Sequence, residues 1–240
     1  MKKFIQILSL SLIITACTPQ ELQNVLGTIA GNGMLTEQEI GLGLKEALTI
    51  GIGKGSDQLS QINGYFDSPY KILLPEEARK VTDKLKVIPG FSDIEAKLVE
   101  RLNRAAEEAA KGAKNIFVGA IKQITFQDAL SILMGEKNAA TNYLERTTYR
   151  ALYDEFQPVI LNALEEVQAA QLWREVVTKY NTLPLVQKVN PSLDDHVTGK
   201  ALVGLFSMVE KKELEIRTNI SERTTPLLRK VFAKQDNDQN

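Results

Sequence analysis

The chain is 240 residues long, with 43% hydrophobic and 25% charged residues and a formal net charge of −1. This near-neutral balance excludes the strongly basic face on which nucleic-acid binding depends. A single histidine and a single cysteine leave few soft ligands for a metal ion, so we expect neither a metal site nor a cofactor. The length is sufficient for a sizeable core in one domain or in two small ones.

The N-terminus has the pattern of an export signal. Two lysines follow Met1, an apolar run covers residues 4–14, and the small residues Thr15 and Ala16 precede Cys17. A basic start, a short apolar run and small residues before the cut are typical of a secretory signal peptide. A transmembrane anchor is the alternative, but a span needs about 20 apolar residues and the polar run 18–21 closes this one too early.

Ile14-Thr15-Ala16-Cys17 resembles the bacterial lipobox, in which an aliphatic residue and two small residues precede a modified cysteine. The resemblance implies that a diacylglycerol is joined to the Cys17 sulfur, that the chain is cut before Cys17, and that the new amine is acylated, as with palmitate. An ordinary signal peptide with a coincidental cysteine is the alternative. Because residue 18 is threonine rather than aspartate, analogy with enteric bacteria predicts the outer membrane, with the domain facing the periplasm.

Helix start signals recur from residue 36 onward. A threonine or serine followed three residues later by glutamate forms a capping box, which satisfies free amides at a helix N-terminus. Two such boxes are predicted, Thr36 with Glu39 and Ser92 with Glu95. Apolar residues at helical spacing follow each box, and Glu107 is expected on the solvent-facing side of the second helix, paired with Lys111.

Prolines and glycines mark the other helix boundaries, because proline favours a first turn and glycine follows a last one. The predicted boundaries lie at Pro75, Pro89, Thr125, Gly135, Asn138, Pro191 and Pro226, and Pro158 either starts a helix or kinks a continuous one. No stretch shows the sustained period-two alternation of a strand. The sequence therefore predicts an all-α fold, a single compact domain of seven to nine helices. Its divisions are a signal peptide (1–16), a linker from the lipidated cysteine (17–35), the helical domain (36–234) and a disordered tail (235–240).

Two motifs suggest ligand sites but fit a structural role better. The string Gly51-Ile-Gly-Lys-Gly-Ser56 lacks the spacing and the preceding strand of a phosphate-binding loop. Its glycines are interpreted as close helix-packing positions or a kink. Asp194, Asp195 and His196 are consecutive, and consecutive helical side chains point about 100° apart, so they do not converge on one metal ion.

Three charged residues, Glu210, Glu213 and Arg217, lie on one helical face near the C-terminus. We interpret them as a solvated ion-pair face, which contributes little stability. The alternative is a charged patch that contacts the basic segment 223–230.

Several longer strings together resemble a bacterial family of exported helical proteins catalogued as a domain of unknown function. They cover residues 36–232 and include Gly41-Leu-Gly-Leu-Lys-Glu-Ala-Leu48, Leu102-Asn-Arg-Ala-Ala-Glu-Glu-Ala-Ala110, Phe126-Gln-Asp-Ala-Leu-Ser-Ile-Leu-Met-Gly135 and Arg223-Thr-Thr-Pro-Leu-Leu-Arg-Lys-Val-Phe232. The resemblance implies an all-helical fold with export or lipid attachment, and it carries no activity or catalytic residues. A site is to be sought among the polar residues of these strings, Lys45, Glu46, Asn103, Arg104, Glu107, Asp128 and Thr141, which equally fit helix-to-helix hydrogen bonds.

Three functions are consistent with these observations. The preferred one is a non-enzymatic lipoprotein, bound to the membrane through lipid on Cys17, that binds an envelope protein or a cell-wall partner. The second is a carrier of a hydrophobic ligand in a groove between helices, for which the aromatic residues between Tyr143 and Phe156 are candidates. The third is an enzyme that uses Asp128, Glu107 and Arg104.

Overall fold

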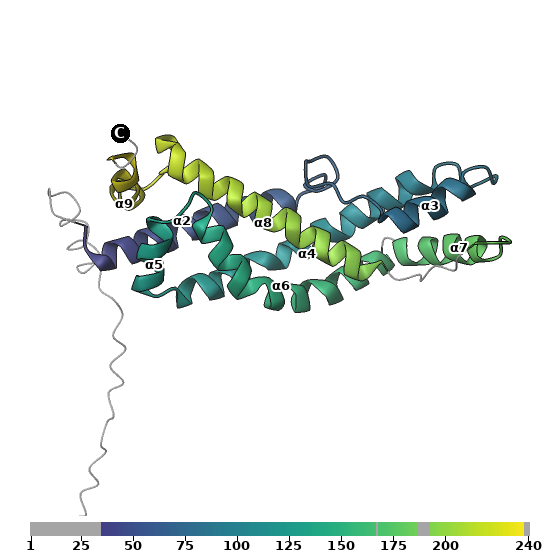
Figure 1. Cartoon of the computed structure of the whole chain (residues 1–240), viewed down its shortest axis with the longest axis horizontal. Helices are drawn as coiled ribbons and strands as arrows, with labels where there is room; N and C mark the ends of the chain where they lie inside the picture. Colours follow the sequence, from purple (N-terminus) through teal and green to yellow (C-terminus); the bar gives the residue numbers. More distant parts are fainter. Residues whose placement is uncertain (1–34, 167, 187–192, 238–240) are drawn as a thin grey trace, which may run out of the picture. The chain divides into compact units, whose positions relative to one another are not determined.

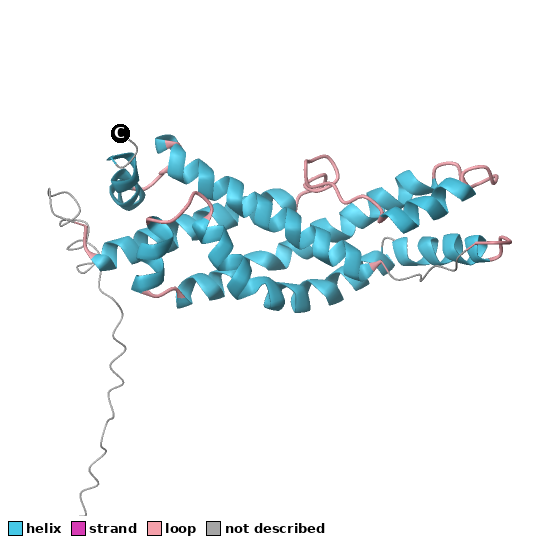
Figure 2. Cartoon of the chain, viewed as in Figure 1, coloured by secondary structure: helices cyan, strands magenta, loops and turns pink. Residues whose placement is uncertain are grey.

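The computed structural model describes residues 35–166, 168–186 and 193–237, and every regular element within them is helical (Figures 1 and 2). The elements are α2 (Glu37–Leu59), α3 (Glu76–Leu85), α4 (Ile94–Gln123), α5 (Phe126–Leu133), α6 (Ala139–Glu166), α7 (Ala169–Asn181), α8 (Asp194–Thr218), the 3₁₀ helix η1 (Ile220–Glu222) and α9 (Pro226–Asn237). The predicted all-α class is confirmed, with eight α-helices in the described residues. The predicted signal peptide, Cys17, most of the linker and Pro191 lie outside them.

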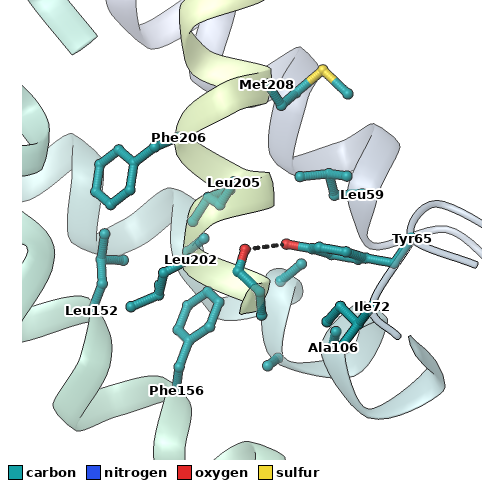
Figure 3. Packing of buried hydrophobic residues seen from close by; sticks show 14 of the residues in the cluster. Leu59, Tyr65, Ile72, Ala106, Leu152, Phe156, Leu202, Leu205, Phe206 and Met208 are labelled. Carbon is teal, nitrogen blue, oxygen red and sulfur yellow. Dashed lines mark hydrogen bonds between the residues drawn. The ribbon is translucent and has the colours of Figure 1, made fainter. Parts of the chain in front are cut away.

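Four long helices form the centre of the fold. α4 packs against α2 and α6, and α8 packs against the same two helices, so that the four close into a bundle. Their apolar faces follow the helical period, and Leu44, Leu98 and Leu205 on these faces are all buried. Figure 3 shows part of this core, where the Tyr65 hydroxyl donates a 2.8 Å hydrogen bond to the Ala201 carbonyl of α8.

The shorter helices pack at the two ends of the bundle (Figure 1). We call the polar end the group formed by α5, α9, the first half of α2, the start of α6 and the C-terminal part of α8 with η1. There α5 and α9 both pack on α2, and α5 also contacts α6. We call the apolar end the group formed by α3, α7, the start of α4 and the end of α6, in which α3 and α7 pack on each other and on α4.

The predicted helix starts are confirmed in part. The Thr36–Glu39 capping box is present, and a second box joins Thr125 to Asp128. The box predicted at Ser92 is wrong, because α4 begins at Ile94 with Asp93 as its N-cap, and no side chain caps the helix. A serine at the right spacing does not cap a helix that starts two residues later.

The course of the chain after residue 138 also differs in detail from the prediction. Pro158 lies inside α6, so the helix is continuous there, as in the second of the two alternatives. The helix predicted to continue from Val159 to Val177 instead breaks before α7, where Gln168 adopts a left-handed conformation (φ 55°) and its carbonyl accepts a 2.8 Å hydrogen bond from Arg101. α9 extends to Asn237, into the region predicted as a tail.

Glycines allow the closest helix contacts, as was predicted for the glycine-rich part of α2. A Cβ added at Gly43 would lie 2.6 Å from the Val231 Cγ2 of α9, and one added at Gly55 would lie 2.9 Å from the Met208 Cγ of α8. A Cβ at either distance would force the neighbouring side chain or its helix to shift. The string from Gly51 to Ser56 is therefore part of a helix-packing surface.

Candidate functional site

The polar residues predicted as a candidate cluster lie on four helices. They are Lys45 and Glu46 on α2, Arg104 and Glu107 on α4, Asp128 on α5 and Thr141 on α6. Among the described residues, only Arg104 and Glu107 are joined by a hydrogen bond or ion pair within this set. All but the half-buried Glu46 hold local segments of the fold in place through their own partners.

Glu107 is buried, although the sequence placed it on the wet side of α4. Its Oε1 accepts hydrogen bonds from the backbone N–H groups of Tyr65 and Phe66, each 3.2 Å long. Its Oε2 accepts a 2.7 Å bond from the Arg104 guanidinium, which also reaches the Asn63 side chain at 2.8 Å. The predicted pair with Lys111 is wrong, because Lys111 pairs with Glu108 instead. Glu107 thus satisfies the buried amides of the loop between α2 and α3.

Asn103 fastens the same loop one turn away. Its side-chain oxygen accepts a 2.8 Å hydrogen bond from the Ile72 N–H, and its side-chain nitrogen donates a bond of equal length to the Ile72 carbonyl. This fully buried amide therefore pairs with the backbone as a neighbouring strand would. Burial and the nearby Glu107 carboxylate raise the pKa of Tyr65, which keeps its hydroxyl protonated as the donor to Ala201.

Thr141 donates hydrogen bonds to one member of a buried ion pair at the polar end. The Glu213 carboxylate of α8 accepts hydrogen bonds from the N–H groups of Ala140 and Thr141 and from the Thr141 hydroxyl, at 2.8 to 2.9 Å. These are free amides at the N-terminus of α6, where a negative charge is also favoured by the helix dipole. Glu213 therefore caps α6 from another helix.

Arg217 completes this ion pair. Its Nε donates to Glu213 at 2.9 Å, and its two terminal nitrogens donate to the Ile132 and Leu133 carbonyls at the end of α5, at 2.8 and 3.0 Å. Both charged side chains are 5% exposed. The prediction of a solvated ion-pair face is therefore wrong for Glu213 and Arg217. Together they hold the α5–α6 connection against α8, and we call them the α8 clamp.

A sequence signal for the α8 clamp exists. Leu205, Val209, Glu213 and Arg217 follow one another at four-residue spacing on the buried face of α8. A charged pair in line with two core residues is expected to be buried as well. The i,i+4 spacing of their opposite charges is also the spacing of exposed helix pairs, and it therefore favours the opposite prediction of a solvated face.

The α8 clamp continues into the basic segment that follows α8. Arg223, only 2% exposed, donates to the Arg217 carbonyl at 2.8 Å and to both carboxylate oxygens of Asp236 on α9. This guanidinium holds the pKa of Asp236 below its ordinary value. Lys230 of α9 bonds to Glu39 of the first capping box at 2.7 Å and lowers the pKa of that carboxyl. Of the predicted contact between the charged patch and this segment, the structure shows the bond from Arg223 to the Arg217 backbone carbonyl.

The other predicted polar residues have local partners. Asp128 accepts hydrogen bonds from the Thr125 hydroxyl and N–H in the cap of α5, and these bonds lower the pKa of its carboxyl. Lys45 donates a 3.0 Å hydrogen bond to the Lys122 carbonyl at the end of α4. The Asp128 contact caps the start of α5, and the Lys45 contact joins α2 to the end of α4.

The consecutive acids and histidine at the start of α8 do not form a metal site. The described residues contain no cluster of three His, Cys, Asp or Glu side chains that could hold a metal ion. The His196 Nε2 atom lies 2.9 Å from the Leu73 carbonyl oxygen. Asp195 accepts a hydrogen bond from the Tyr153 hydroxyl, which raises the pKa of that tyrosine to about 12. These contacts connect α8 to α6 and to the loop before α3.

A small apolar space lies at the polar end, between α2, α6, α8 and α9. It leaves about 20 Å³ for the centre of a water-sized molecule, and its wall consists of apolar side chains with the α8 clamp. That volume holds one water molecule and no larger ligand. An open groove of about 510 Å³ lies beside α7 and is lined by Phe91, Gln171, Arg174, Glu175, Thr178, Lys179 and Thr182. None of the predicted polar cluster borders either space.

The described helices are too short or too polar to cross a membrane singly. α4 and α5, bent by 108° between them, meet the length and composition of a span only as a pair.

The fold and these contacts define an all-helical domain whose polar residues hold the bundle together. Comparison with protein families places the chain in one of them: residues 34–233 match the family described as "Protein of unknown function (DUF4197)". The match covers most of the chain, so the protein belongs to this family, as the strings quoted above indicated. No curated protein and no solved structure matches the chain.

Proposed function

We propose that the protein is a lipoprotein of the bacterial cell envelope, attached through lipid on Cys17 to the outer membrane and facing the periplasm. The N-terminal pattern that ends in Ile14-Thr15-Ala16-Cys17 is the observation that carries this proposal. Two or three acyl chains give stable anchoring, which a single chain does not. Cys17 is the only cysteine, so its thiol has no disulfide partner within the chain.

We further propose that the helical domain is a binding or scaffolding module rather than an enzyme. The supporting observation is that the polar family residues serve the fold: Glu107 holds the loop after α2, Thr141 meets the α8 clamp, and Asp128 caps α5. Within the described residues no hydrogen bond or ion pair links Glu107 to Asp128. A partner is therefore expected to bind the outer surface of the bundle.

The carrier alternative is less well supported. A site that buries a small ligand needs about 300–1,000 Å³, far more than the small apolar space at the polar end. The groove beside α7 is large enough, but charged and polar side chains line most of it, which does not suit an acyl chain. Of the aromatic residues proposed for a ligand groove, Phe156 is buried in the core, and Tyr149 stacks on Phe206 with ring centroids 6.3 Å apart.

Labelled palmitate fed to growing cells tests the anchor. The wild type should incorporate the label and fractionate with outer membranes, whereas Cys17→Ser should lose both properties. Incorporation that is unchanged in Cys17→Ser would contradict the lipid anchor. Fractionation of an acylated protein with the inner membrane would contradict the assigned location alone.

Crosslinking in intact cells followed by mass spectrometry tests the binding role. A specific envelope protein or peptidoglycan fragment should be recovered with the wild type and reduced with Cys17→Ser, because loss of the tether removes the domain from its partner's membrane. Native mass spectrometry of the purified domain is the complementary measurement. A bound lipid there would favour the carrier.

A further inference from the structure

Helix α5 is apolar on both of its faces. Its inner face packs in the core through Ala129, Ile132 and Leu133. Its outer face carries Phe126 and Leu130, and Met134 directly follows the helix; they are 55%, 40% and 46% exposed. Because these three are spaced by four residues, they lie in one row along the helix, which we call the α5 stripe. A helix with two apolar faces needs an apolar environment on each of them.

The α5 stripe contacts α2 at Phe126. Gly41 lets the Phe126 ring lie directly on α2, since a Cβ there would be 2.8 Å from the ring. Leu42, next to Gly41, is 46% exposed. Lys45, one turn further along α2, bonds to the carbonyl of Lys122 just before α5. Contiguous exposed apolar residues mark an interaction surface more often than isolated ones do.

The position of the α5 stripe in the chain suggests its partner. α5 packs on α2, the first described helix, and residues 18–34 are all that separate Cys17 from Leu35. A segment of this length spans at most about 60 Å when fully extended. A lipid on Cys17 therefore keeps this end of the bundle within reach of the bilayer at all times, which raises the effective concentration of the lipid surface.

We propose that the α5 stripe rests on the phospholipid surface of the membrane that holds Cys17. Phe126, Leu130 and Met134 would enter the boundary between headgroups and acyl chains, as the apolar face of an interfacial helix does. This inference rests on the proposed lipid anchor. It adds an orientation, in which the polar end faces the membrane and the apolar end points away from it.

A second copy of the chain is a poorer fit to the same surface. Stable protein interfaces bury roughly 1,200–2,000 Å² in total. Three half-exposed side chains and Leu42 offer much less area than that, so pairing of two stripes would not hold a dimer. A bilayer needs no such area, because the acyl chains on Cys17 supply the attachment and the stripe only sets the orientation.

Site-specific fluorescence on the full lipidated protein tests the proposal. In that protein Cys17 is blocked, so Leu130→Cys provides the only free thiol for an environment-sensitive dye. Val203→Cys on α8 is the matched control, because Val203 is 58% exposed and lies outside the α5 stripe. Met134→Cys repeats the test one turn from Leu130. Each protein is placed in vesicles of phosphatidylethanolamine and phosphatidylglycerol that contain a trace of nitroxide-labelled lipid.

We expect the dye at positions 130 and 134 to shift to the blue, and the nitroxide lipid to quench it at least about two-fold more than at position 203. Equal quenching at all three positions in acylated protein would overturn the membrane contact while leaving the anchor intact. A blue shift that grows with protein density, without quenching, would show self-association and likewise overturn the contact. An unmodified Cys17 by intact mass would overturn the anchor, and with it the tether on which this inference depends.

Discussion

The two ends of the bundle are stabilised by different means. At the polar end, the α8 clamp, Arg223 and Lys230 join α5, α6, α8, α9 and α2 through charged hydrogen bonds, most of them shielded from water. At the apolar end, α3 and α7 pack through residues such as Val81, Leu85 and Trp173, and the ion pairs there are exposed, as between Glu76 and Lys80.

This difference shows two ways of fixing helix termini. At the polar end, several helices begin or end next to one another, and their free N–H and C=O groups need partners; Glu213 and Arg217 supply them from a third helix. At the apolar end, side-chain packing dominates beside the Arg101 bond to the Gln168 carbonyl, and among the described residues the buried Trp173 Nε1 has no hydrogen-bond partner. We expect loss of a buried charge to destabilise the polar end strongly, whereas loss of an exposed charge at the apolar end should have little effect.

The largest effect should come from breaking the α8 clamp. Arg217→Met leaves the Glu213 carboxylate buried without its counter-charge, which should lower the free energy of unfolding by about 3–5 kcal/mol in urea titrations. The exposed pair at the apolar end provides the control, since Lys80→Met should cause no measurable change. Equal effects of the two substitutions would remove the distinction between the ends. Combining Arg217→Met with Glu213→Leu should cost less than the sum of the single changes.

A second test concerns the close contact between α2 and α9. Gly43→Ala places a methyl group against Val231 and should destabilise the fold by about 1–3 kcal/mol through overpacking. Val231→Ala added to it should restore part of the loss in thermal unfolding. Gly112→Ala on α4 meets no atom within 4 Å and should instead stabilise by about 0.5–1 kcal/mol. If Gly112→Ala also destabilises the fold, the loss seen in Gly43→Ala would not be due to the close contact with Val231.

A change of volume tests the apolar end. Trp173→Phe removes an unpartnered N–H and leaves a small space, so the two contributions partly offset each other. We expect a loss on the order of 1 kcal/mol, measured by urea unfolding. A loss as large as that of Arg217→Met would indicate that Trp173 has a polar role beyond its packing.

The smallest effect should depend on pH. Lys230 stabilises the ionised form of Glu39, so the folded pKa of that carboxyl lies below its ordinary value of 4.5. The pair should contribute about 0.2–1 kcal/mol, present in full above pH 4.5 and lost as the pH falls through the folded pKa. Urea unfolding of the wild type and of Lys230→Met should therefore differ above pH 4.5 and converge in acid, as the pH falls through the folded pKa of Glu39. A difference that is constant with pH would exclude this pair as its cause.

Local sequence patterns were sufficient for much of the fold. Thr36 with Glu39 marked the start of α2, and the apolar spacing of Ile94, Leu98 and Leu102 marked the buried face of α4. These features depend on residues within one or two turns of each other, so a single sequence contains them. The failures at Ser92 and Glu107 arose where a local pattern had two solutions and distant contacts decided between them.

The sequence by itself determined the helical class, most helix limits, the family and the predicted export signal that ends at Cys17. Only the tertiary structure decided the environment of the charged residues. The row with Leu205 and Val209 indicates the buried face of α8, but the partners of the pair lie far along the chain: Glu213 reaches Thr141 across 72 positions and Arg217 reaches Leu133 across 84. Burial of a charge depends on partners that folding brings from far along the chain, because only such partners offset the loss of water.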